Sequence, residues 1–139
     1  MSKTAFLFAG QGSQHVGMGR DLYETYLVFR EVIDNAHLDF DLRSLMFGGP
    51  DEQLSQTRYT QPCMVAFAAG MTAVLDELGI RPDYVAGLSL GEYSALAAAG
   101  VFEPQQAIQL AAFRGSAMAR VRGPSLCDGL DFGFSARGG

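Results

Sequence analysis

A serine flanked by glycines is the sharpest chemical feature of this 139-residue sequence. Ser89 is the central residue of the segment 87–91, GLSLG, which follows a short apolar run and precedes a run of small residues. This order predicts a tight strand-to-helix turn that presents the serine hydroxyl at the carboxyl end of a strand. The Leu90 amide, at the start of the helix, would stabilise the oxyanion formed when Ser89 attacks a thioester. The same spacing is also typical of a serine that only caps a helix, so both roles stay open.

A second glycine-flanked turn is expected at 10–14, GQGSQ, after the first apolar run. Such a turn can aim main-chain amides at an anionic centre. It does not match a dinucleotide fingerprint, because His15 stands where the third glycine would fall. It does not match a phosphate loop either, because Gly17 is followed by Met18 rather than by a lysine. A tight turn without any ligand is an equally good interpretation.

Arg114 interrupts one of two possible apolar stripes on the last expected helix. If Ala107 and Ala111 face the core, the guanidinium of Arg114 faces it too and needs a partner, for which a substrate carboxylate is well suited. If Ile108 and Gly115 face the core instead, Arg114 is exposed. The sequence alone does not decide between the two stripes.

The histidines and cysteines do not form a recognisable site. His15 and His37 lie in no motif that would make either one the base of Ser89, so a solvated surface position is favoured for both. Cys63 and Cys127 lie far apart without a paired-cysteine motif or clustered histidines, which argues against a disulfide framework and a zinc site. Two reduced thiols are typical of a cytoplasmic protein.

The elements that must position these residues alternate between strand and helix. Short apolar runs at 5–9 and 84–88 predict buried parallel strands. Helices are expected at 91–99 and from Pro104 to about Arg120, and a long one after Thr60, a capping hydroxyl, and Pro62. The apolar face expected for the long helix consists of Met64, Phe67, Ala68, Met71, Leu75 and Leu78. A helical pattern also runs through 16–33, and a short helix is expected at 41–47, so the sequence predicts an α/β domain with a parallel sheet.

Charge and hydropathy exclude several classes of partner. The net charge is −5, and the nine arginines are scattered, so a surface that tracks nucleic-acid phosphates is not expected. No run is long enough for a membrane span, and the apolar segment at 5–9 is too short for a signal peptide. We therefore expect a cytoplasmic protein with one domain over residues 1–121. The glycine-rich tail at 122–139 has no periodic apolar face and is expected to be disordered or foreign to the fold.

Four motifs in order resemble the signature of malonyl-CoA:acyl carrier protein transacylases. They are GQGSQ at 10–14, QP at 61–62, GLSLGEY at 87–93 and FRG at 113–115. Four motifs in register are far more specific than one strand-to-helix turn. The resemblance covers roughly residues 3–120 and implies the N-terminal part of the transacylase large subdomain over 1–121, with a partial parallel-sheet core like that of the α/β-hydrolases.

The resemblance also implies an activity and a role for each candidate residue. Ser89 would take the malonyl group from malonyl-CoA as an ester and pass it to acyl carrier protein, a ping-pong exchange of fatty acid biosynthesis without a metal or cofactor. The family's two oxyanion-hole amides fall on Gln11 and Leu90. The arginine that pairs with the free malonyl carboxylate falls on Arg114. Malonyl-CoA and acyl carrier protein are the expected partners, with no nucleic acid or membrane among them.

The sequence departs from the family pattern in two places. Leu88 stands where the family commonly has histidine. The family's catalytic histidine and its inserted ferredoxin-like small subdomain lie further along the chain than Gly139. The resemblance therefore implies a truncated and impaired enzyme, whose missing strands would expose apolar sheet edges and favour self-association.

Three other interpretations fit parts of the sequence. A serine hydrolase or thioesterase would use the same serine turn but would need neither the turn at Gln11 nor an arginine facing the acyl group. A non-catalytic fragment would explain the absent histidine. An acyltransferase domain of a polyketide synthase would share the motifs, although a chain that begins directly ahead of its first strand is more typical of a freestanding protein.

Overall fold

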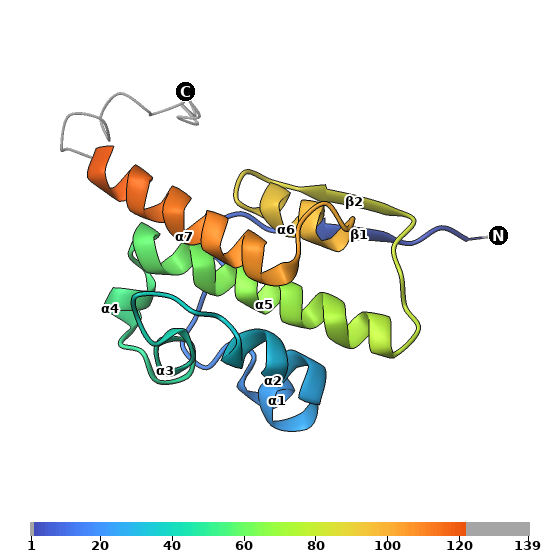
Figure 1. The fold of residues 1–139 in the computed structure, drawn as a ribbon, viewed down its shortest axis with the longest axis horizontal. Helices are drawn as coiled ribbons and strands as arrows, with labels where there is room; N and C mark the ends of the chain where they lie inside the picture. Colours follow the sequence, from blue (N-terminus) through green and yellow to red (C-terminus); the bar gives the residue numbers. More distant parts are fainter. Residues whose placement is uncertain (1, 122–139) are drawn as a thin grey trace, which may run out of the picture.

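Two short parallel strands form the sheet in the computed structural model, which describes residues 2–121. The expected tail at 122–139 lies outside the described residues. Strand β1 (Ala5–Phe8) pairs with β2 (Tyr84–Gly87), and the register places Ala5 opposite Tyr84. The long crossover between them holds five helices, and Figure 1 shows the two strands side by side above the longest of these. The parallel pairing confirms the predicted α/β arrangement, in a mixed fold dominated by helices.

Four short helices precede the longest one: α1 (Arg20–Thr25), α2 (Leu27–Asp34), α3 (Leu42–Gly48) and α4 (Asp51–Leu54). The helix expected at 41–47 is thus present as α3. Asp41 is its N-cap, and its carboxylate accepts a hydrogen bond from the Ser44 amide at 3.0 Å. That hydrogen bond, with a second one from the Ser44 hydroxyl, holds the pKa of Asp41 below its usual value.

Helix α5 (Thr57–Glu77) is the centre of the fold, and α7 (Pro104–Val121) lies along it (Figure 1). The prediction that Thr60 caps α5 is wrong, because the helix begins one turn earlier, at Thr57. The Thr60 hydroxyl instead donates a hydrogen bond to the Leu54 carbonyl, inside the protein. Helix α6 (Gly91–Ala98) connects β2 to α7 and contacts both strands.

The buried face of α5 differs from the predicted one. The predicted large side chains are only half-buried, and Leu78 is 56% exposed. The fully buried face carries smaller residues, which let neighbouring helices approach: a Cβ added to Gly70 would lie 2.6 Å from the Phe29 ring of α2. The face predicted from the periodicity of large apolar residues is therefore not the core face. It lines a cavity of about 420 Å³ beside β1.

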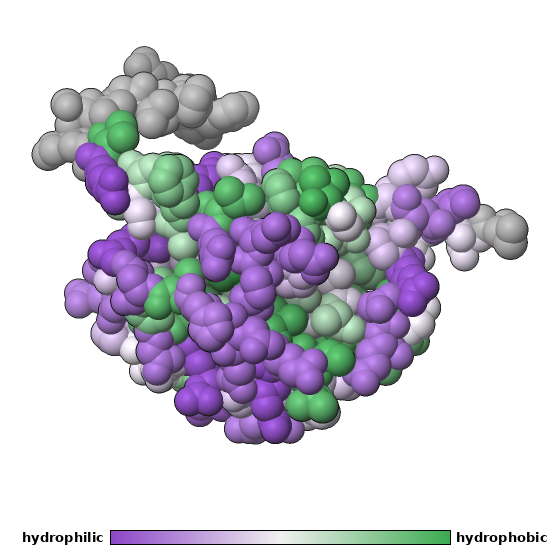
Figure 2. Space-filling model, viewed as in Figure 1, coloured by the Kyte–Doolittle hydropathy of each residue, from purple (hydrophilic) through white to green (hydrophobic). Residues whose placement is uncertain are grey.

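The strands are less buried than predicted. Leu7 is 80% exposed and Tyr84 is 64% exposed. A parallel strand is buried on both faces only when helices cover both, and residues 2–121 do not supply that cover. Figure 2 shows hydrophobic side chains gathered where Figure 1 places α6, β1 and β2. None of the helices in this described part is both long and apolar enough to cross a membrane.

Candidate active site

Ser89 lies on a sharp turn between β2 and α6. Its φ is 52°, a left-handed conformation that is unusual for a residue with a side chain. The turn depends on its two glycines: a Cβ at Gly87 would lie 2.1 Å from the Gly91 carbonyl, and one at Gly91 would lie 2.2 Å from the Phe8 carbonyl oxygen. The strand-to-helix turn predicted for GLSLG is therefore present, and the Ser89 side chain is exposed at its tip.

The glycine turn after β1 lies against this serine turn. The Leu88 amide donates to the Phe8 carbonyl at 3.1 Å, and a Cβ at Gly10 would lie 3.0 Å from the Leu88 carbonyl oxygen. Within residues 2–121, no acceptor takes the backbone N–H of Gln11 or of Leu90. Two backbone amides, one on each turn, are thus left without an acceptor in this part of the chain, as the donors of an oxyanion hole must be.

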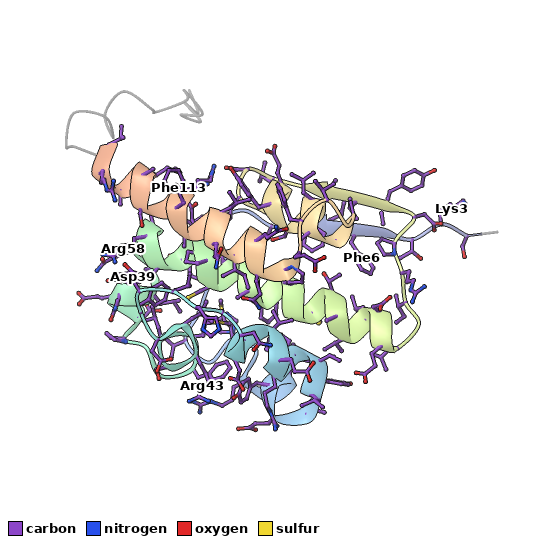
Figure 3. All side chains as sticks on the ribbon, viewed as in Figure 1. Lys3, Phe6, Asp39, Arg43, Arg58 and Phe113 are labelled. Carbon is purple, nitrogen blue, oxygen red and sulfur yellow. The ribbon has the colours of Figure 1, made fainter. Side chains whose placement is uncertain are left out.

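Arg114 extends from α7 to the serine. Its Nη2 donates to Ser89 Oγ at 3.2 Å, and its Nη1 donates to Gln61 Oε1 at 3.0 Å. The guanidinium carbon lies 5.6 Å from the centre of the Tyr93 ring, a cation–π contact. Its neighbour Phe113 is 75% exposed and projects away from α5 in Figure 3. Arg114 is half-buried and contacts Ser89, so it matches neither of the two alternatives that the sequence left open, a core-facing or an exposed side chain.

The two stripes considered for α7 are combined in its buried face. The residues buried on this helix are Ala107, Ile108, Ala111 and Gly115. Gly115 makes the closest approach, because a Cβ there would lie 2.8 Å from the Thr57 carbonyl oxygen in the first turn of α5. This contact fixes the distance between the two helices directly beside Arg114.

Gln61 is a site residue to which the sequence analysis assigned no role. It is fully buried, and its Nε2 lies 3.4 Å from Gln11 Oε1 and 3.3 Å from Met118 Sδ. The side-chain NH₂ group of Gln11 in turn donates a hydrogen bond to Thr57 Oγ1 at 3.1 Å. A polar residue directly before the helix proline, in the motif QP, was the signal that pointed to this position.

A pocket of about 350 Å³ joins these groups. It is lined by Gly10, Gln11, Gln61, Leu88, Ser89, Leu90, Arg114 and Met118. The pocket therefore unites all four residues predicted from the sequence, Ser89, Leu90, Gln11 and Arg114. A hydroxyl, two amides and a guanidinium on one small space can hold a short acyl group that carries a carboxylate.

The histidines and Cys63 stand apart from the pocket. His15 is exposed, with Nδ1 3.4 Å from the Ser13 carbonyl oxygen, and His37 is exposed as well. Neither lines the pocket. Cys63 is buried, and burial raises the pKa of its thiol to about 12, so it is no nucleophile in the folded chain. Across residues 2–121, no three His, Cys, Asp or Glu side chains are grouped as metal ligands.

Known proteins similar to this chain are acyltransferases. The family model described as acyl transferase domain matches residues 5–130. The malonyl CoA-acyl carrier protein transacylase of Bacillus subtilis (strain 168) is 44% identical over 120 residues, which cover 85% of this chain and 38% of that protein. Crystalline MCAT from Streptococcus pneumoniae has a TM-score of 0.81 and 51% identity, over 85% of this chain and 39% of the other.

A third similar protein was solved with its partner. The PlMCAT:AntF structure, a type II PKS acyl-carrier protein in complex with its malonyl-transacylase, matches with a TM-score of 0.82 and 41% identity, over 88% of this chain and 40% of that one. This chain thus spans about two fifths of the length of these relatives. The similarities confirm the predicted resemblance to the transacylases and the partial α/β fold.

Proposed function

Because the chain belongs to the acyl transferase domain family, we propose that it carries the acyl-accepting serine of a malonyl-CoA:acyl carrier protein S-malonyltransferase. One observation carries the proposal: Nη2 of the Arg114 guanidinium lies 3.2 Å from Ser89 Oγ in a pocket that Gln11 and Leu90 also line. A hydrolase of simple acyl groups needs the serine and the amides but has no use for this arginine. A dicarboxylic acyl group needs all of them.

The first half of the proposed reaction loads the serine. Ser89 Oγ attacks the thioester carbonyl of malonyl-CoA and gives up its proton, while the Leu90 and Gln11 amides stabilise the oxyanion. Collapse of the intermediate breaks the carbon–sulfur bond, and coenzyme A leaves as a thiol after it takes up a proton. Arg114 pairs with the free carboxylate of the malonyl group throughout, which favours malonyl over acetyl groups.

The second half of the reaction returns the serine. The phosphopantetheine thiol of acyl carrier protein attacks the malonyl ester through the same oxyanion, and Ser89 leaves with a proton as a free hydroxyl. This exchange would serve fatty acid biosynthesis, and the complex of PlMCAT with an acyl-carrier protein supports a carrier-protein partner. No step of this scheme uses a metal or a redox cofactor.

The scheme needs a base for the Ser89 proton, and we propose that the base comes from outside residues 2–121. Neither His15 nor His37 lines the pocket. Removal of the histidine from a serine protease triad costs roughly 10⁶-fold in kcat. The isolated chain is therefore expected to accept malonyl groups slowly and to turn over feebly.

The exposed strands support a further expectation, that copies of the isolated chain associate. Leu7 is 80% exposed on β1, and apolar strands that lack cover favour association with other chains. Sedimentation velocity across a concentration series tests this, with Leu7→Lys as the variant. A monomer at every concentration would contradict the expectation.

Intact-mass measurement after incubation with malonyl-CoA tests the proposed function. The chain should slowly gain one malonyl group on Ser89 and lose it to added phosphopantetheinyl acyl carrier protein, and Ser89→Ala should gain none. A chain that unfolds cooperatively and never gains the group, even over days, would be a non-catalytic fragment. A chain that gains malonyl groups and releases them only to water would be a hydrolase.

A further inference from the structure

Gln61 is the most buried polar group beside the pocket, and the proposed reaction does not use it. The side chain is 0% exposed. A buried amide is costly unless both its ends have partners. Here the carbonyl oxygen accepts from Arg114, and the NH₂ group faces Gln11 Oε1 and Met118 Sδ. Such full use of a buried side chain indicates a specific structural task.

The chemistry of the partners fixes the orientation of the Gln61 amide. A guanidinium can only donate hydrogen bonds, so the group of Gln61 that faces Arg114 must be its oxygen. The NH₂ group is then directed to the carbonyl oxygen of the Gln11 side chain, whose own NH₂ donates to Thr57 on α5. Gln61 therefore links the arginine of α7 with the glycine turn after β1.

The other contacts of Arg114 do not fix the rotation of its guanidinium group, and the hydrogen bond to Gln61 does. Gly115 holds α7 close to the first turn of α5, and the Tyr93 ring lies on one side of the guanidinium. Neither contact decides which nitrogen faces the pocket. With Nη1 held on Gln61 Oε1, Nη2 faces Ser89.

We propose that Gln61 is a positioning residue that sets the selectivity of the serine by holding the guanidinium of Arg114 toward the acyl group. The proposal rests on the proposed malonyl transfer. Gln61 does not touch the reacting atoms. Its loss therefore lowers acylation of Ser89 by malonyl-CoA and leaves acylation by acetyl-CoA nearly unchanged.

Gln61→Met tests the proposal, because methionine keeps the length of the side chain but neither accepts from Arg114 nor donates to Gln11. The ratio of Ser89 acylation rates with malonyl-CoA and acetyl-CoA should fall about tenfold or more, the size expected for one hydrogen bond to a charged group. Gln109→Met, at an exposed position of α7, is the matched control and should keep the ratio. An unchanged ratio in Gln61→Met would overturn the proposal.

A spectroscopic measurement separates positioning from chemistry. In ¹⁵N NMR, the Nη groups of Arg114 should give resolved signals with slow rotation in the wild type and averaged signals in Gln61→Met. Gln61→Glu should keep them resolved, because the carboxylate still accepts, yet lower the ratio by neutralising the guanidinium. Averaged Arg114 signals in the wild type would overturn the proposal even if Gln61→Met does not fold.

The two proposals fail in distinguishable ways. If the wild type reacts with neither thioester, the proposed function fails, and the NMR comparison still decides whether Gln61 orders Arg114. If the wild type prefers malonyl-CoA and Gln61→Met keeps that preference, the proposed function stands and the role of Gln61 is refuted.

Discussion

The two sides of this molecule differ in how completely residues 2–121 bury them. On the helical side, α2, α5 and α7 pack closely, with Phe29 fully buried against Gly70. On the sheet side, β1 and β2 carry Leu7 and Tyr84 largely exposed. The pocket lies where the two sides meet: α5 supplies Gln61, α7 supplies Arg114 and Met118, and the turns after the two strands supply the other lining residues. Gln61 and Arg114, to which we ascribe selectivity, thus stand on well-packed helices, whereas Ser89 stands on the turn after a strand that has little cover.

The largest difference in the free energy of unfolding is expected between a truncation in the helical side and a truncation in the sheet. Phe29→Ala removes a fully buried ring from the helical side and should lower the free energy of unfolding by roughly 3–5 kcal/mol. Leu7→Ala, on the exposed strand, should change it by less than about 0.5 kcal/mol. Urea unfolding followed by circular dichroism measures both. Similar losses for the two variants would mean that the strands are as well packed as the helices.

Ionisation of the buried Cys63 thiol should give the next largest change in the free energy of unfolding. The pKa of Cys63 is raised to about 12 by burial, whereas an unfolded thiol ionises near pH 9. Above that pH the unfolded state binds fewer protons than the folded one, so stability should fall by about 1.4 kcal/mol per pH unit between pH 9 and 12.

Two variants isolate that effect. In a Cys127→Ser chain, where Cys63 is the only thiol, a disulfide reagent should react only as fast as the chain unfolds. Cys63→Ala should remove the excess loss of stability at high pH. Rapid labelling of Cys63 at neutral pH would show that this part of α5 opens without unfolding.

A single added methyl group should increase the distance between α7 and α5. Gly115→Ala places a Cβ 2.8 Å from the Thr57 carbonyl oxygen and should cost about 1–3 kcal/mol of stability. Because Arg114 is adjacent, the preference for malonyl over acetyl groups should fall as well. Gly48→Ala is the matched control, since a Cβ there meets nothing within 4 Å. Equal unfolding midpoints for the two variants would contradict the close packing.

The smallest expected effect is at the cap of α3. Asp41→Ala should cost about 1 kcal/mol, because the Ser44 amide loses its acceptor. The pKa of Asp41 is lowered in the folded chain, so its contribution is present above the unfolded pKa and is lost as the pH falls through the folded value. Asp41→Asn, which caps without titrating, should weaken this dependence. Acid titrations of unfolding that are identical for wild type and Asp41→Asn would refute it.

Local patterns in the sequence predicted the serine turn well. Gly87 and Gly91 are needed there because the backbone of α6 and of β1, respectively, passes about 2 Å from where each Cβ would lie, which is the reason that the motif predicts the turn. Position 114 was ambiguous, because an alanine-rich helix offers two similar apolar stripes. The rotation of α7 is set by its packing, which buries Ala107, Ile108, Ala111 and Gly115 together.

Other features depended on packing that a local pattern does not contain. The buried face of α5 is made by small residues such as Gly70, and a search for periodic large apolar residues does not detect them. The motif QP marks position 61, but the contacts of Gln61 are with Gln11 and Arg114, about 50 positions away on either side, so no local spacing revealed what it does. The exposure of β1 depends on which elements cover the sheet, and the apolar run at 5–9 contains no information about them.

In the proposed reaction, Ser89 and Arg114 act on the two ends of one malonyl group. The most direct measurement is the rate of Ser89 acylation by malonyl-CoA and by acetyl-CoA in the wild type and in Arg114→Ala. We expect the acylation rate of Arg114→Ala to fall about 10- to 100-fold with malonyl-CoA and little with acetyl-CoA. Equal losses with both thioesters, or none with either, would contradict it.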